Sequence, residues 1–143
     1  MKSVEIFTDG GCRGNPGPGG YGCIIRDGDN VLELKGSHLK TTNNIMEMTA
    51  AIVALKKLSE PHQVTLSTDS QYLVKGMTEW INGWIKKGWK TASRQPVKNK
   101  ELWQELHNLS KKHEITWVWV KGHAGHPENE RCDQLANEAM ANI

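Results

Sequence analysis

"VEIFTDGG" (residues 4–11) and "VTLSTDSQ" (residues 64–71) are built on one plan. Each begins with a short run in which apolar residues alternate, continues with Thr-Asp, and ends in small or polar residues. Alternation with a period of two predicts β-strands. If the two strands are parallel neighbours, Asp9 and Asp69 emerge side by side at their carboxyl ends, the edge at which open α/β sheets place their ligands. The pair therefore predicts an α/β fold with an acidic site.

The rest of the chain predicts a mixed sheet flanked by helices. Asp27-Gly28 is a hairpin-turn signal between two strand-like segments, so the N-terminal strands should form an antiparallel meander. An amphipathic pattern over residues 43–58 separates this meander from the next strand, and a strand-helix-strand order implies parallel pairing. The expected strands are 2–9, 20–26, 31–36, 63–68 and 115–120, and the expected helices are 43–58, 71–76, 79–87, 100–112 and 127–141.

Length and composition favour one cytoplasmic domain over residues 1–143. The longest apolar run, "AAIVAL" at 50–55, is far shorter than the ~20 residues of a membrane span. Glu5 and Asp9 stand where a signal peptide would be apolar. The cysteines, which are odd in number and widely spaced, predict reduced thiols: Cys12, Cys23 and Cys132.

A basic segment stands out although the formal net charge is only +2. No acidic residue lies between Glu79 and Glu101, whereas basic residues crowd positions 86–100 of that interval and tryptophans are interleaved with them. Cations and aromatic rings suit a nucleic acid, but a solvated basic loop anchored by its tryptophans has the same composition. The residues concerned are Lys86, Lys87, Lys90, Arg94, Lys98, Lys100, Trp80, Trp84 and Trp89.

Two further acids lie at the edges of apolar helix faces, Glu47 in the 43–58 helix and Asp133 in the last helix. Singly, each acid has a plain structural role: Asp69 can cap a helix, Glu47 can oppose a helix dipole, and Asp133 can face solvent. If Glu47 and Asp133 converge with Asp9 and Asp69, the carboxylates repel one another unless a cation neutralises them. Hard oxygen ligands favour Mg²⁺ or Mn²⁺.

A zinc site is the less favoured alternative. His123, His126 and Cys132 could suggest one, but the two histidines share a loop and no second cysteine lies at ligand spacing. The sequence therefore predicts oxygen ligands rather than sulfur and imidazole.

Five longer stretches occur in a specific order: "FTDGGCRGNPGPGGYG", "TTNNIME", "STDSQY", "GWKTASRQPVKN" and "WVKGHAGHPENERCD". With these motifs the chain, from about residue 4 to 141, resembles the bacterial type 1 ribonucleases H, which cut the RNA strand of RNA/DNA hybrids. The resemblance implies a ribonuclease H-like fold, whose five-stranded mixed sheet joins an antiparallel meander to two parallel strands. It also implies hydrolysis by two metal ions, Mg²⁺ or substituting Mn²⁺, that leaves 5'-phosphate and 3'-hydroxyl ends.

The resemblance assigns roles to individual residues. The metal ligands would be Asp9, Glu47, Asp69 and Asp133. His123, in a glycine-flanked loop, would assist proton transfer or product release. Residues 80–100 would form a basic protrusion against the DNA strand, with Trp80, Trp84, Lys86 and Lys87 as contacts. Contacts to 2'-hydroxyls and the minor groove would come from Cys12, Asn15, Asn43, Asn44 and Gln71, and a phosphate pocket from Lys40, Thr42 and Asn99.

The chain departs from the usual motifs at Ile45, where an arginine is common, and at Gly11 and Arg13 beside Cys12. Two rival functions remain open on the sequence. One is a DNA-directed nuclease or strand transferase on the same fold, since a fold does not determine a substrate. The other is a hybrid-binding module without catalysis, based on the basic segment. The expected partner is an RNA/DNA hybrid bound by a monomer, with no membrane contact.

Overall fold

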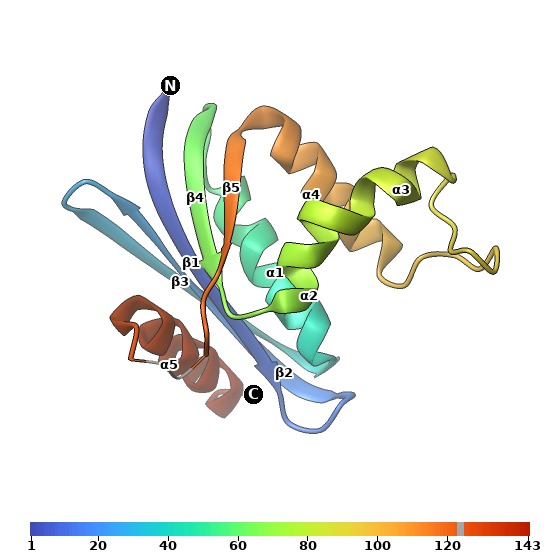
Figure 1. The fold of residues 1–143 in the computed structure, drawn as a ribbon. Coiled ribbons are helices and arrows are strands. Elements are labelled where there is room, and N and C mark those ends of the chain that lie inside the picture. Colours follow the sequence, from blue (N-terminus) through green and yellow to red (C-terminus); the bar gives the residue numbers. More distant parts are fainter. Residues whose placement is uncertain (123–124) are drawn as a thin grey trace.

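A five-stranded mixed sheet forms the centre of the computed structural model, which describes residues 1–122 and 125–143. The strand order is β3-β2-β1-β4-β5 (Figure 1). The first three strands pair antiparallel, whereas β4 pairs parallel with both β1 and β5. This confirms the predicted meander with two added parallel strands. The strands are β1 (Lys2–Cys12), β2 (Gly17–Asp27), β3 (Asn30–Thr41), β4 (His62–Thr68) and β5 (Glu114–Trp119).

Helices cover both faces of the sheet. On one face α1 packs against β1 and β2, with the remaining short helices and α4 beyond it, and on the other face α5 packs against β1, β2 and β3 (Figure 1). None of the helices in the described ranges is long and apolar enough to cross a membrane. The helical elements are α1 (Asn43–Lys56), α2 (Gln71–Lys75), the π-helical turn η1 (Gly76–Trp80), α3 (Ile81–Lys86), α4 (Lys100–Lys112) and α5 (Pro127–Ala141).

The start of α1 is defined by a side-chain cap. The Ile45 backbone N–H donates to the Thr42 hydroxyl at 3.2 Å, which satisfies one of the free N–H groups of the first turn. From there the apolar face of α1 is buried on β1 and β2, in a main core that also contains residues of β4. The predicted helix is confirmed, although it ends two residues early. Its core contacts include Met48, Ile52 and Leu55, packed with Ile6 and Leu66.

Glycines in β2 let α5 lie directly on the sheet. A Cβ atom on Gly22 would stand 2.5 Å from the Cys132 carbonyl oxygen, and one on Gly20 would collide with the Ala136 carbonyl oxygen. Any side chain at these positions would push the helix outward, because backbone atoms cannot move aside as a flexible side chain can. The close packing brings Asp133 to the sheet edge where β1 and β4 carry their acids.

The structure differs from the predicted elements in the lengths of the first three strands and in the second helical segment: β2 begins at Gly17 rather than 20, and β3 ends at Thr41 rather than 36. Strand β1 continues past Asp9 to Cys12 and pairs there with β2 alone, a stretch whose glycines hide the alternating pattern. The two helices predicted at 71–76 and 79–87 form one continuous helical segment through η1. Gly76 explains the path, because a Cβ there would collide with the Trp103 ring of α4.

Candidate active site

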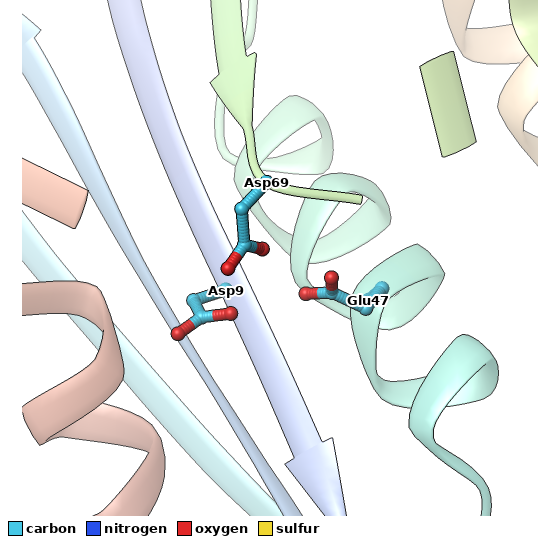
Figure 2. Close-up of side chains that lie close together, drawn as sticks. All are labelled: Asp9, Glu47 and Asp69. Atoms are coloured by element: carbon cyan, nitrogen blue, oxygen red, sulfur yellow. The ribbon is translucent and has the colours of Figure 1, made fainter. Parts of the chain in front are cut away.

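Asp9 and Asp69 lie side by side because their strands are in register. Thr8 of β1 is opposite Thr68 of β4, so the residues that follow emerge together at the same sheet edge. Glu47 reaches the same point from the first turns of α1. Figure 2 shows the three carboxylates pointing toward one another, and one oxygen from each lies within 4.8 Å of the others. We call Asp9, Glu47 and Asp69 the carboxylate cluster.

Gly10 allows Glu47 to approach this closely. A Cβ atom at Gly10 would lie 2.5 Å from the Met46 carbonyl carbon and 2.6 Å from the Glu47 backbone nitrogen. The first turns of α1 therefore rest on bare backbone of β1, immediately beside Asp9. As a result Glu47 is only 5% exposed, which is deeper than its predicted position at the rim of the helix face.

Burial dominates the electrostatics of the cluster. Burial first, and then the neighbouring charges of Asp69 and Asp133, raise the pKa of Asp9 from an ordinary 3.8 to about 8. The Gly10 N–H, which donates to Asp9 Oδ1 at 2.9 Å, opposes this shift. Burial, then the charges of Asp9 and Asp69, likewise raises the pKa of Glu47 well above its usual range. In the absence of a cation the cluster therefore favours bound protons.

Two oxygens of the cluster have no visible donor. Glu47 Oε1 and Asp69 Oδ1 are buried, and neither has a hydrogen-bond partner among the residues that the structure describes. Buried acceptors without donors are costly, and converging carboxylates add their mutual repulsion. A hard divalent cation removes both penalties at once, since it binds carboxylate oxygens. The cluster thus fits a Mg²⁺- or Mn²⁺-type ion.

The cluster lies in a polar cleft of about 650 Å³. Asp133 lines this cleft from α5, where its Oδ2 accepts a hydrogen bond of 3.4 Å from the Asn137 amide. It therefore shares the site but stands outside the close group of three carboxylates. His123, the other predicted catalytic residue, lies outside the described residues.

Nothing in the described residues favours the zinc alternative. Cys132 is fully buried, and its thiol donates to the Phe7 carbonyl oxygen at 3.3 Å. Burial raises the pKa of this thiol, which opposes the thiolate that zinc requires.

The predicted substrate contacts divide into three groups: the residues of the cleft, the phosphate pocket and the basic protrusion. Cys12, Asn43, Asn44 and Gln71 line the same cleft as the carboxylates. Asn15 borders it, because its Oδ1 accepts the Asn43 backbone N–H at 3.1 Å.

The residues of the predicted phosphate pocket do not line one common cavity with the carboxylates. The Thr42 hydroxyl caps α1, Asn99 donates from its amide to the Tyr72 hydroxyl at 3.2 Å, and Lys40 is exposed on β3. Thr42 and Asn99 carry structural contacts of their own, and the role of all three side chains toward a phosphate stays a prediction.

Several lining residues were not singled out from the sequence as site residues: Arg13, Ser70, Tyr72, Trp119, Asn137 and Met140. Arg13 was noted only as an unusual neighbour of Cys12, and Ser70 and Tyr72 only as part of the motif "STDSQY". Asn137 lies one helical turn after Asp133 and could have been found by that spacing. Trp119 begins the motif "WVKGHAGHPENERCD" but was given no role, because a strand pattern already accounted for it.

The basic segment, residues 86–100, extends from α3 to the start of α4 and projects from the body (Figure 1). Its six cations take part in no ion pair within the described chain. Trp84 and Trp89 pack partly against the main core, with ring centroids 6.4 Å apart, as expected of anchors. Trp80 and Trp84 also line a groove of about 240 Å³ together with Lys87. The tryptophans thus anchor the segment and border a basic groove.

Comparison with known proteins identifies the family. The sequence model of RNase H matches residues 1–141. The chain belongs to the RNase H family. This RNase H chain is 61% identical over 140 residues to Ribonuclease H of Hydrogenovibrio crunogenus, covering 98% of the chain and 97% of that relative. It is 64% identical over 137 residues to Ribonuclease H of Geotalea uraniireducens, covering 96% and 93%.

Solved structures place the fold in the same family. LC9-RNase H1, a type 1 RNase H with the type 2 active-site motif, superposes with a TM-score of 0.89 at 33% identity, covering 99% of this chain and 74% of that one. LC11-RNase H1 in complex with an RNA/DNA hybrid gives a TM-score of 0.71 at 29% identity, covering 97% of both chains. The family resemblance and the fold class predicted from the sequence are confirmed.

Proposed function

We propose that this RNase H family member is an endoribonuclease that hydrolyses the RNA strand of RNA/DNA hybrids. It would act as a single catalytic domain over residues 1–143, use two Mg²⁺ ions, and leave 5'-phosphate and 3'-hydroxyl ends. The observation that carries the proposal is the carboxylate cluster, in which buried oxygens that lack donors among the described residues converge in an open polar cleft. Family membership adds the reaction class. LC11-RNase H1, bound to an RNA/DNA hybrid, supports the substrate.

The four acids would hold the ions, with Asp9 central because it faces both Glu47 and Asp69. When bound, the divalent ions activate a water and stabilise the charge that develops on the scissile phosphate. The protein's part is to keep the carboxylates at fixed positions, through the β1–β4 register and the close packing at Gly10. Asp9 and Glu47 would release protons as the ions bind. His123 would assist proton transfer or product release.

Selection of RNA would come from the amide side chains that line the cleft. Asn43, Asn44 and Gln71 present both donors and acceptors, which suits a 2'-hydroxyl because that group both donates and accepts. The carboxylates alone would repel a polyanion. Attraction would therefore depend on the basic segment, whose cations are free of ion pairs in the part of the chain described.

The test uses one labelled RNA strand paired either with DNA or with RNA, and a DNA duplex of the same sequence. With Mg²⁺, we expect cleavage of the RNA strand in the hybrid alone, none with a chelator, and a loss of at least roughly a hundredfold with Asp9→Asn. Cleavage of the DNA duplex would support the DNA-directed alternative. Tight hybrid binding without any cleavage would support the binding module instead.

A further inference from the structure

We propose that Trp119 is a positioning residue that holds Asp69 in place for the reaction. The inference rests on the proposed function, since it concerns the same site. Trp119 is the last residue of β5 and stands opposite Thr68, the last residue of β4. Its indole Nε1–H donates to the backbone carbonyl oxygen of Asp69 at 3.1 Å. A side chain of one strand thus binds the first residue beyond the end of its neighbour.

Two further contacts from the same segment act on Thr68 and Asp69. The Val120 backbone N–H donates to the Thr68 carbonyl oxygen at 2.9 Å, which extends the pairing past the end of β5. At Gly122 a Cβ atom would lie 2.8 Å from Asp69 Oδ2, so the chain passes directly against the carboxylate there. Residues 119–122 therefore contact Thr68 and both the backbone and the carboxylate of Asp69.

This arrangement restrains a metal ligand without occupying its lone pairs. Asp69 Oδ1 is buried and lacks a hydrogen-bond partner among the described residues, so the carboxylate is not oriented through that oxygen. The bond from Trp119 restrains the backbone instead, and leaves the oxygen available to an ion. Groups that hydrogen-bond to metal ligands without touching the metal commonly affect both the metal affinity and the rate of the catalysed reaction.

Core packing does not account for Trp119. Its side chain is 44% exposed and lines the catalytic cleft. Trp117, two residues earlier on the same strand, is partly buried against the main core. The two tryptophans therefore make a matched pair on one strand. Trp117 packs against the core, and Trp119 binds Asp69.

The decisive variants remove the N–H donor. In Trp119→Phe we expect kcat for the hybrid to fall roughly ten- to a hundredfold, with KM within about twofold of the parent. Calorimetric titration with Mn²⁺ alone, without nucleic acid, should show affinity weakened by roughly tenfold. Trp117→Phe, the control, should lower the melting temperature but retain the parent's kcat and Mn²⁺ affinity. Benzothienylalanine at position 119 retains the ring shape without the N–H, and should reproduce the losses even if Trp119→Phe folds poorly.

Unchanged kcat and Mn²⁺ affinity in the benzothienylalanine protein would overturn the proposal. So would a raised KM with unchanged kcat, because the ring would then serve as a platform for the substrate. If the parent itself fails to cut the hybrid, the proposed function is lost. The Mn²⁺ titrations of parent and variants still decide whether Trp119 positions Asp69.

Discussion

The carboxylate cluster and the basic segment carry opposite charges under opposite constraints. In the cluster, like charges are buried and forced together, and two oxygens lack donors among the described residues. In the basic segment the cations are separated along an exposed chain, while Trp84 and Trp89 anchor it to the core. The cluster therefore destabilises the folded protein until an ion binds, whereas the basic segment has little effect on stability. Only substitutions in the cluster should show a trade-off, in which stability rises while activity falls.

The largest effect is expected when one acid of the carboxylate cluster is replaced. Asp9→Asn should lower hybrid cleavage by roughly a hundredfold or more, because a charged ligand at the reacting phosphate is lost. The same change should raise the free energy of unfolding without divalent ions by about 1–3 kcal/mol, since Asn needs no proton to be neutral in this buried site whereas Asp9 must take one up as the chain folds. Cleavage assays and urea denaturation in a chelator measure the two effects.

Asp27→Asn is the matched control for this pair of effects. Asp27 is an exposed acid at the end of β2, so its replacement should change neither cleavage nor stability appreciably. If Asp9→Asn were inactive and also less stable than the parent, the carboxylates would be stabilising one another, contrary to the comparison above.

The second prediction concerns pH. Asp9 has a folded pKa of about 8 against an ordinary 3.8, so the folded state binds this proton more tightly than the unfolded state does. Its contribution to stability is complete below about pH 4 and is lost as pH rises through about 8. The free energy of unfolding of the ion-free protein should therefore fall by about 1–3 kcal/mol more between pH 5 and pH 8 than that of Asp9→Asn does.

Denaturation curves at the two pH values, in a chelator and in excess Mg²⁺, test this dependence. Mg²⁺ should restore the stability at the higher pH, because it binds the ionised cluster. Equal pH slopes in the parent and in Asp9→Asn would show that Asp9 does not hold its proton in the folded state.

The third prediction addresses the basic segment. Lys86→Ala combined with Lys87→Ala should weaken hybrid binding several-fold and reduce the slope of log affinity against log salt by roughly 1–2, since each phosphate contact contributes about 0.9. Stability should change little. The pair Lys111→Ala and Lys112→Ala, exposed at the end of α4, provides a control of equal charge. An equal loss of slope in both pairs would mean that overall charge, not the basic segment, drives binding.

The smallest effect is expected at Arg13. This exposed side chain lines the catalytic cleft and forms no ion pair within the ranges described, so we expect it to meet one phosphate of a bound strand. Arg13→Ala should reduce the salt slope by about 1, and Arg13→Lys should retain most of it. Binding titrations at several salt concentrations measure both. An unchanged slope in Arg13→Ala would place its charge outside the binding site.

Local patterns in the sequence predicted most of the elements. The helix at 43–56 and the strand at 62–68 appear as expected because their periodicity and caps are local. The ends of β1 and β2 were missed, since glycines there remove the alternating pattern while leaving the backbone free to pair. The π-helical turn at Gly76 was also missed, and so was the close approach of Gly76 to the ring of Trp103 in another helix, which no local pattern shows.

By itself, the sequence determined the paired Thr-Asp strand ends, the acid-free basic segment and the motifs of the family, all of which are written in neighbouring residues. The tertiary structure alone decided that Glu47 is buried beside Asp9 and that Trp119 reaches Asp69, 50 residues earlier in the chain. The physical reason is that both depend on how closely elements approach. Gly10 and Gly122 permit this close approach because glycine has no Cβ atom. The periodicity of neighbouring residues does not show where such an approach occurs.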